Sequence, residues 1–166
     1  MTQDIVIKDK THLDGLLDKE TDDFVTFVVD EQLFGIPVLQ VSDTLNIGEV
    51  AVIPLAPPRV KGCINLRGRI VTVIDVRTSL GIPDNPDKTN GSSKQMGITV
   101  EQGNDLYTLL VDRIGEVVSI SSDQRERIPQ TLDGNWKDVA LSVYKLEDEL
   151  MIVLDPDRLI SSSPAQ

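Results

Sequence analysis

The chain has 166 residues, a length that suits one domain or two very small ones. Sixteen basic and 27 acidic side chains give a formal net charge of −11, which repels nucleic-acid phosphates and anionic lipid head groups. The one cysteine, Cys63, cannot form an internal disulfide, and Cys63 with the one histidine, His12, is too small a set for a usual zinc site. The composition argues against nucleic-acid partners and predicts no metal and no cofactor.

The N-terminal residues 1–22 mix charged residues with scattered Ile and Leu, which predicts a flexible acidic tail or, as an alternative, a marginal helix. The start MTQDIVIKDK lacks the basic region and the long apolar run of a signal peptide. No apolar run reaches the roughly 20 residues that a membrane span needs. We therefore expect a soluble, cytoplasmic protein without direct membrane insertion.

After this tail the chain consists of short runs rich in Val, Ile, Thr and Phe, a pattern typical of a many-stranded β domain. The runs are DFVTFVVD, QLFGIPV, EVAVIPL, GCINL, RIVTVIDV, QMGITVE, DLYTLLVD, ALSVYKL and LMIVLD. The segment PVLQVSDTL departs from this pattern, because Pro37 suits a first helical turn and its apolar residues recur at i, i+3 and i+7. It predicts one or two turns of helix, with Asp43 pointing away from the apolar stripe.

The two halves of the chain repeat one pattern. At an offset of 73 residues, the positions that match are Thr26, Phe27, Leu33, Phe34, Val38, Val41, Asp43 and Leu45 with Thr99, Val100, Leu106, Tyr107, Val111, Ile114, Glu116 and Val118. Further on, LRGRIVTVID (66–75) matches LEDELMIVLD (146–155) at an offset of 80. We therefore expect a mostly β fold of two similar barrels of about five strands, at about 23–81 and 95–160, joined by a crossover at 82–94.

The stretch VKGCINLRGRIVTVIDV, residues 60–76, predicts a hairpin that turns at Arg67-Gly68, because glycine supplies the positive φ of such turns. The expected pairs are Leu66 with Arg69, Ile64 with Val71, Asn65 with Ile70, and Cys63 with Thr72. Both faces are largely apolar, so one should fill a barrel and the other should pack against a second layer, for which the second barrel is the natural candidate. From chemistry alone, Arg67 is more often a solvated turn residue than a functional one.

These segments resemble the CheW family of bacterial chemotaxis coupling proteins. The resemblance rests on VKGCINLRGRIVTVIDVRTSLG, with GIPVLQVSDTL before it and VDRIGEVVSI and VYKLEDELMIVLDPDRLI after it, and it covers residues 23–163. It implies two five-stranded SH3-like barrels packed through a hydrophobic seam, with a few short helices. It also implies a non-enzymatic adaptor that binds the regulatory domain of the histidine kinase CheA and the cytoplasmic tips of methyl-accepting chemoreceptors. Such a protein would associate with receptor arrays at the inner membrane.

The resemblance also implies site residues. The family's motif arginine, associated with receptor engagement, falls on Arg67, and the acidic residue of its VQE motif falls on Asp43, with Val41 before it. Aspartate is one methylene shorter than the usual glutamate, which leaves open whether Asp43 contacts Arg67 directly or through water. Arg113 stands where the family usually has glycine, so the second barrel's copy of the site is less transferable.

We hypothesise that Asp43 positions Arg67, and that Val41, Gly62 and Ile70 form an apolar patch that accepts a receptor helix. Gly62 would let the helix backbone approach closely. In the family the first barrel usually faces the kinase. The candidate kinase contacts are therefore its apolar edges at Val50, Val52, Ile53, Val71 and Val73, although β-branched strand residues are more often core.

Other functions fit less well. Asp43, Asp75, Glu116 and Asp155 could pair as general acid and base, but no GxSxG motif occurs and the globular region has no histidine to serve Cys63. Asp75 and Asp155 end strands symmetrically, which a turn or a helix cap explains more simply. Neither a Walker loop nor GxGxxG occurs, and few aromatic residues argue against a nucleic-acid surface. The remaining alternative is a CheW-like scaffold for another histidine kinase pathway, such as surface motility or development.

Overall fold

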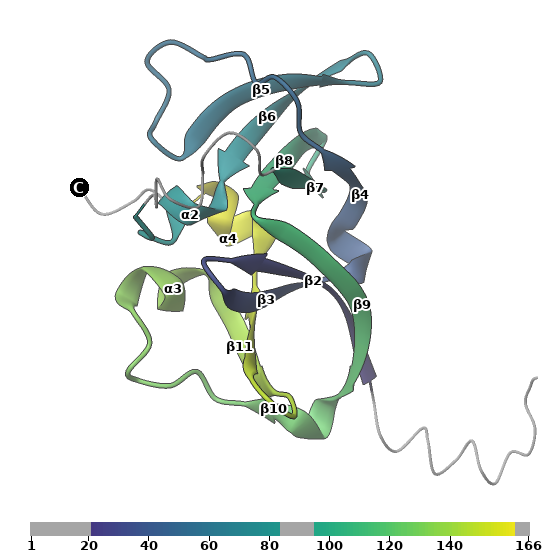
Figure 1. The fold of residues 1–166 in the computed structure, drawn as a ribbon, viewed down its shortest axis with the longest axis vertical. Helices are drawn as coiled ribbons and strands as arrows, with labels where there is room; N and C mark the ends of the chain where they lie inside the picture. The colour runs from purple at the N-terminus through teal and green to yellow at the C-terminus, as the bar shows by residue number, and fades with distance from the viewer. Residues whose placement is uncertain (1–20, 84–94, 162–166) are drawn as a thin grey trace, which may run out of the picture.

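The computed structural model describes residues 21–83 and 95–161, so most of the expected tail and crossover lies outside the described residues. The described part is mostly β, with two sheets and a few short helices, as expected (Figure 1). Thr21 and Asp22, assigned above to the tail, already belong to the strand β2 (Thr21–Val29). No helix within the described ranges is long and apolar enough to span a bilayer.

The first sheet has five strands in the order β4-β7-β8-β6-β5, and the second has six in the order β10-β11-β12-β3-β2-β9. The first sheet contains β4 (Val41–Asn46), β5 (Val60–Leu66), β6 (Arg69–Asp75), β7 (Met96–Gln102) and β8 (Asp105–Val111). The second contains β2, β3 (Gln32–Pro37), β9 (Arg113–Ser121), β10 (Arg125–Glu126), β11 (Ala140–Lys145) and β12 (Leu150–Leu154). The helices are η1 (Val38–Gln40), α2 (Val76–Ser79), η2 (Ser122–Gln124), α3 (Gly134–Val139) and α4 (Pro156–Ser161).

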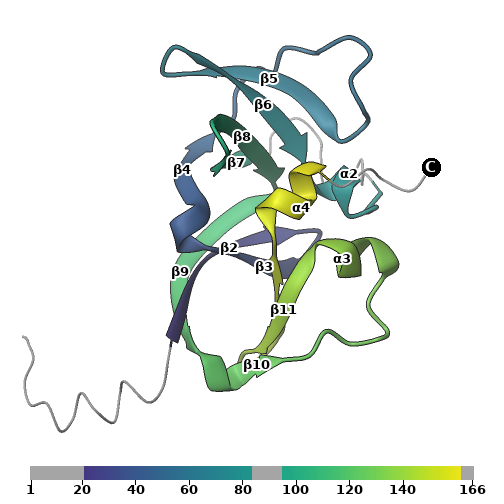
Figure 2. The same ribbon diagram turned by 180° about the vertical axis from the view of Figure 1, so that it is seen from behind.

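Each sheet takes strands from both halves of the chain. The hairpin β2–β3 lies between β9 and β12, and the hairpin β7–β8 lies between β4 and β6 (Figures 1 and 2). Parallel pairs join the halves, with Phe34 opposite Ile152 and Leu109 opposite Ile74. The predicted division into barrels at 23–81 and 95–160 is therefore wrong. A repeat predicts the order of elements, but two similar hairpins can each pair with either half.

The internal repeat itself is visible in the topology. Read from β9, the second sheet runs β9-β2-β3-β12-β11-β10, which matches β4-β7-β8-β6-β5 with β10 added. In both copies an aspartate at the end of the last long strand, or directly after it, caps a helix. Asp75 Oδ1 accepts a hydrogen bond from the backbone N–H of Arg77 at 3.0 Å, and Asp155 Oδ1 accepts one from Asp157 at 3.0 Å. The interpretation of these aspartates as caps is confirmed.

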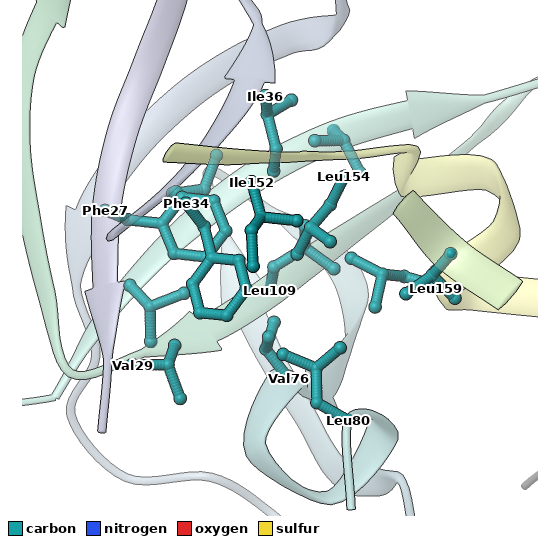
Figure 3. Close-up of a cluster of buried hydrophobic side chains, with 14 of the residues drawn as sticks. Phe27, Val29, Phe34, Ile36, Val76, Leu80, Leu109, Ile152, Leu154 and Leu159 are labelled. Atoms are coloured by element: carbon teal, nitrogen blue, oxygen red, sulfur yellow. The ribbon is translucent and has the colours of Figure 1, made fainter. Parts of the chain in front are cut away.

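A single large core lies between the two sheets, which confirms the predicted hydrophobic seam (Figure 3). The second sheet contributes Val25, Phe27, Val29, Phe34, Ile36, Val143, Ile152 and Leu154, and the first contributes Ile74, Ile98, Val100, Leu109 and Val111. The rings of Phe27 and Phe34 stack with their centroids 5.6 Å apart. Full burial of such a side chain contributes about 1.5–3 kcal/mol, so this layer holds the two sheets together as one body.

A smaller cluster fills the other face of the second sheet, with Phe24, Ile120, Tyr144, Met151 and Val153 buried. The hydroxyl of Tyr144 donates to Asp22 Oδ2 at 2.8 Å. Burial, together with this bond and the Asp22 charge, raises the pKa of the Tyr144 phenol above its ordinary value. The phenol therefore stays protonated and keeps its role as a hydrogen-bond donor.

A buried arginine ties the two sheets together beside the main core. The side chain of Arg77 on α2 is 7% exposed, and its Nη2 lies 2.8 Å from Asp112 Oδ2 and its Nη1 3.3 Å from Asp30 Oδ1. Asp30 lies in the β2–β3 turn, and its backbone N–H donates to Asp112 Oδ2 at 2.8 Å. Arg77 also donates to the carbonyl of Pro83 at 3.0 Å. The guanidinium therefore holds the turn of one sheet against the helix of the other.

We predict that Arg77→Ala lowers the free energy of unfolding by about 2 kcal/mol. Removing one member of a buried ion pair lowers stability more than removing one member of a surface pair. The two aspartates are partly exposed to solvent, which limits the loss. Urea denaturation followed by circular dichroism measures the change. Arg158→Ala is the matched control, because it removes an exposed arginine from an i,i+3 pair with Asp155, and it should cost under about 0.5 kcal/mol. Equal losses in the two variants would contradict this role of Arg77.

Candidate functional site

The β5–β6 hairpin has the predicted register. Its partners are Leu66 with Arg69, Asn65 with Ile70, Ile64 with Val71, and Cys63 with Thr72. The turn residues Arg67 and Gly68 have φ of 53° and 86°, the two positive values of a type I′ turn. Figure 1 shows the hairpin at the edge of the molecule farthest from the second sheet.

One expectation about this hairpin holds for only part of its length. Val71 on the inner face is fully buried, as expected. The other face of β6 carries both Ile70 and Ile74, and Ile74 packs in the main core between the two sheets, whereas Ile70 near the tip is 72% exposed. An apolar outward face that its own chain leaves open is a candidate interaction surface.

Arg67 and Asp43 form a direct ion pair, with Arg67 Nη2 2.8 Å from Asp43 Oδ2. The Arg67 side chain is 79% exposed and that of Asp43 is 26% exposed. The shorter side chain of aspartate therefore reaches Arg67 without a bridging water. The hypothesis that Asp43 positions Arg67 is in accord with this contact.

Asp43 reaches Arg67 from a strand and not from the predicted helix. The helix is a single 3₁₀ turn at Val38–Gln40, and β4 follows it at once. Asp43 lies opposite Thr99 of β7. β-branched Val41 and Thr44 suit a strand, and pairing with β7 outweighs the weak helical spacing.

The first sheet is curled so that its two edges approach. β4 and β5 stand at opposite ends of the strand order, yet the ion pair links β4 to the tip of the β5–β6 hairpin. Ala51, beyond the end of β4, exchanges two backbone hydrogen bonds with Cys63 of β5, at 2.9 and 2.8 Å. The site therefore depends on the curvature of the whole sheet.

Gly62 was predicted to admit a receptor helix, and this is wrong. Gly62 is buried with φ of 151°, and a Cβ added there would lie 2.1 Å from the carbonyl oxygen of Ala51 and 2.7 Å from Val50 Cγ1. The close approach that needs glycine is made by the protein's own chain.

The predicted kinase contacts separate into two groups. Val71 and Val73 are fully buried, so they are core residues that cannot touch a partner, and that prediction is wrong. Val52 is 79% exposed, Ile53 is 36% exposed, and Val50 is half-buried. Leu55 on the same loop, which was not among the predicted residues, is fully exposed with φ of 62°. The sequence could have indicated this exposure, because Leu55 lies between prolines in IPLAPPR and prolines prevent a strand from continuing there.

Ile70 lies in a groove of about 300 Å³ beside the 49–51 segment. The groove is lined by Glu49, Val50, Ala51, Cys63, Ile64, Asn65 and Ile70. The predicted receptor residue Ile70 thus shares a surface with the predicted kinase residue Val50. Val41, by contrast, is half-buried and packs against the main core. A larger hollow of about 540 Å³ opens on the second sheet near Phe24 and Leu39, and no predicted site residue lines it.

The second copy of the site lacks the ion pair. Glu116 stands at the repeat position of Asp43, and Glu147 stands at that of Arg67. Arg113 lies on β9 opposite Val28. Two carboxylates cannot pair as a cation and an anion do, so the Arg67 site occurs once among the described residues. Within the same residues, no group of three or more His, Cys, Asp or Glu is placed to hold a metal ion.

Comparison with known proteins agrees with this fold. Residues 23–163 match the CheW-like domain. The chain belongs to the CheW family. The resemblance drawn from the sequence is therefore confirmed.

Similar proteins cover most of the chain. The chemotaxis protein CheW of Treponema pallidum is 26% identical over 142 residues, which are 86% of this chain and 84% of that protein. The chemotaxis protein CheW of Thermotoga maritima is 28% identical over 151 residues, which are 91% of this chain and 93% of that protein. The crystal structure of the scaffolding protein TtCheW from Thermoanaerobacter tengcongensis matches with a TM-score of 0.74 at 26% identity, covering 89% of this chain and 92% of that one.

We predict that Gly62→Ala lowers the free energy of unfolding by about 2 kcal/mol, because the added methyl group collides with the backbone of Ala51. Urea denaturation measures the loss. Gly48→Ala is the matched control, since no atom lies within 4 Å of its added Cβ, and it should change stability by under about 0.5 kcal/mol. A Gly62→Ala protein as stable as the parent would contradict the close contact with Ala51.

Proposed function

We propose that this CheW-family protein is a chemotaxis adaptor that couples methyl-accepting chemoreceptors to the histidine kinase CheA. Family membership over residues 23–163 supports this role, as do relatives named chemotaxis protein CheW and a similar structure named a scaffolding protein. On this proposal the protein acts in the cytoplasm, in receptor arrays at the inner membrane. It transmits a signal by binding and has no catalytic step.

The observation that carries the proposal is the Arg67–Asp43 ion pair at an exposed hairpin tip. An exposed pair contributes only about 0–1 kcal/mol to folding, so stability alone is a weak reason for its geometry. A held guanidinium suits recognition, because its planar fork can pair with Asp43 and also with carbonyl or carboxylate oxygens of a partner. Lysine lacks that fork.

The proposed receptor surface consists of Arg67, Asp43 and Val41, with Ile70 at its border. A receptor helix presents side chains at i, i+3, i+4 and i+7, so one helix can lay an apolar stripe beside the arginine. Arg67 would then set the register of the helix along the hairpin tip.

The proposed kinase surface is the loop after β4, with Val50, Val52 and Ile53 and the added residue Leu55. Exposed apolar side chains on one loop are typical of an interaction surface. Leu55 also has a left-handed backbone, which costs energy for a branched side chain and so favours a functional reason for its position.

Two surfaces on one rigid body give a physical route for coupling. The groove lined by Ile70 and Val50 lies between them and shares a side chain with each. Receptor binding and kinase binding favour each other only if both select the same arrangement of the hairpin and the loop, which makes coupling a free energy between distinct sites.

We predict that Arg67→Ala keeps the fold and weakens receptor binding at least about 10-fold, the scale for loss of an interfacial arginine. Co-sedimentation with receptor-bearing membranes measures binding, and urea denaturation should show a loss under about 1 kcal/mol. Arg69→Ala is the matched control, because Arg69 flanks the same turn and is exposed. Normal binding by Arg67→Ala would remove the receptor assignment. If the parent bound neither CheA nor receptor tips, a scaffold role in another kinase pathway would replace the proposal.

We predict that Val52→Asp and Leu55→Asp each weaken binding to the CheA regulatory domain at least about 10-fold, because a charge would be buried in an apolar contact. Calorimetric titration measures the affinity, and receptor binding should be unchanged. Val117→Asp is the control, because Val117 is an exposed apolar residue of β9 in the other sheet. If the loop variants bound the kinase domain as tightly as Val117→Asp does, the loop would not be the kinase surface.

A further inference from the structure

We infer that Asn65 is a positioning residue for Arg67. Its side chain holds the left-handed turn that aims the guanidinium at Asp43, and so prepares Arg67 for a partner. The claim about the turn rests on the structure of this chain alone. The claim about the partner rests on the proposed receptor-binding function.

The turn at the hairpin tip is unfavourable for arginine. Arg67 has φ of 53°, a region that arginine rarely adopts and that glycine, asparagine and aspartate tolerate better. In a two-residue hairpin turn, the flanking residues Leu66 and Arg69 make the last ladder bonds, so the N–H of Gly68 has no strand partner. Asn65 Oδ1 accepts a hydrogen bond from this N–H at 2.9 Å. The bond fixes the peptide group between Arg67 and Gly68.

The other end of the ion pair is held in a similar way. Asp43 Oδ1 accepts a hydrogen bond from the backbone N–H of Thr44 at 2.8 Å, while Oδ2 faces Arg67. Each member of the pair is therefore oriented by a local bond to the backbone. Ordering an arginine side chain on binding costs conformational entropy, and a side chain already ordered in the free protein avoids much of that cost. Arg67 remains 79% exposed, so its other donors are open to a partner.

The repeat supplies an internal comparison. At the tip of the β11–β12 hairpin, Lys145 stands at the position of Asn65 and Glu147 at that of Arg67. No residue of that tip has a positive φ, and Leu146 N–H donates to the carbonyl of Glu149 at 2.9 Å. A hairpin of the same repeat thus closes without the strained conformation. Of these two repeat-related tips, the one with the left-handed turn is the one that carries the ion pair, which points to a role in positioning Arg67.

Asn65 also lines the groove that contains Ile70, so it could instead touch a partner directly. The two roles differ in a measurable way. A positioning residue acts through Arg67, so its loss has no further effect once the guanidinium is gone. A direct contact loses affinity whichever residue occupies position 67.

The first experiment uses the protein without a partner. Hydrogen exchange of the Gly68 amide is followed by NMR in the parent, Asn65→Ala and Asn65→Asp. We expect exchange about 10-fold faster in Asn65→Ala, the scale for loss of one hydrogen bond, and near-parent exchange in Asn65→Asp, which keeps an acceptor oxygen. Asn104→Ala, an exposed asparagine in the β7–β8 turn, is the control and should leave Gly68 unchanged. Unchanged exchange in Asn65→Ala would overturn the inference.

The second experiment measures affinity for a soluble cytoplasmic receptor fragment by calorimetry. We expect Asn65→Ala to bind about 10-fold more weakly than the parent and Asn65→Asp to recover most of the affinity. In an Arg67→Lys background, Asn65→Ala should change affinity by under about 2-fold. An equal loss in both backgrounds would overturn positioning in favour of direct contact. If the parent itself did not bind the fragment, the proposed function would fail, and the exchange of Gly68 would decide the role of Asn65 by itself.

Discussion

The exchange of hairpins between the two halves is the constraint on which the rest of the structure depends. β2–β3 completes the sheet built mainly by the second half, and β7–β8 completes the sheet built mainly by the first. Because each hairpin is central in its sheet, neither half can satisfy its backbone hydrogen bonds alone. The shared core and the buried guanidinium of Arg77 then hold the sheets at one mutual position. The hairpin tip and the loop after β4 are therefore carried by a rigid body.

The Arg67–Asp43 pair is a product of this architecture and not of local sequence. Its members come from opposite ends of a strand order, and they meet because the sheet curls until Ala51 pairs with Cys63. Gly62 permits that curl, since a side chain there would strike Ala51. Gly62, which was predicted to contact a receptor helix, instead makes the geometry of the site possible and is itself buried.

The sequence predicted those features that depend on residues close together in the chain. The turn at Arg67-Gly68, the register of its hairpin and the capping role of Asp75 all follow from turn and cap preferences within a few residues. The pairing of strands between the two halves could not be predicted in this way, because the two copies of the repeat have similar hairpins and the sequence does not show which sheet each hairpin joins. Tertiary pairing also replaced the expected helix at Asp43 with a strand. The burial of individual side chains could not be predicted either, because Val71 and Ile70 are both apolar neighbours and only the fold decides which one faces solvent.

The two hairpin tips of the repeat carry opposite charges, Arg67 and Arg69 on one and Glu147, Asp148 and Glu149 on the other. A duplicated scaffold would ordinarily offer two equivalent docking positions related by its internal symmetry. Here the sign change removes that equivalence and gives the molecule a polarity. A ligand that requires the guanidinium can occupy one position in one orientation, so its stoichiometry is fixed at one per chain.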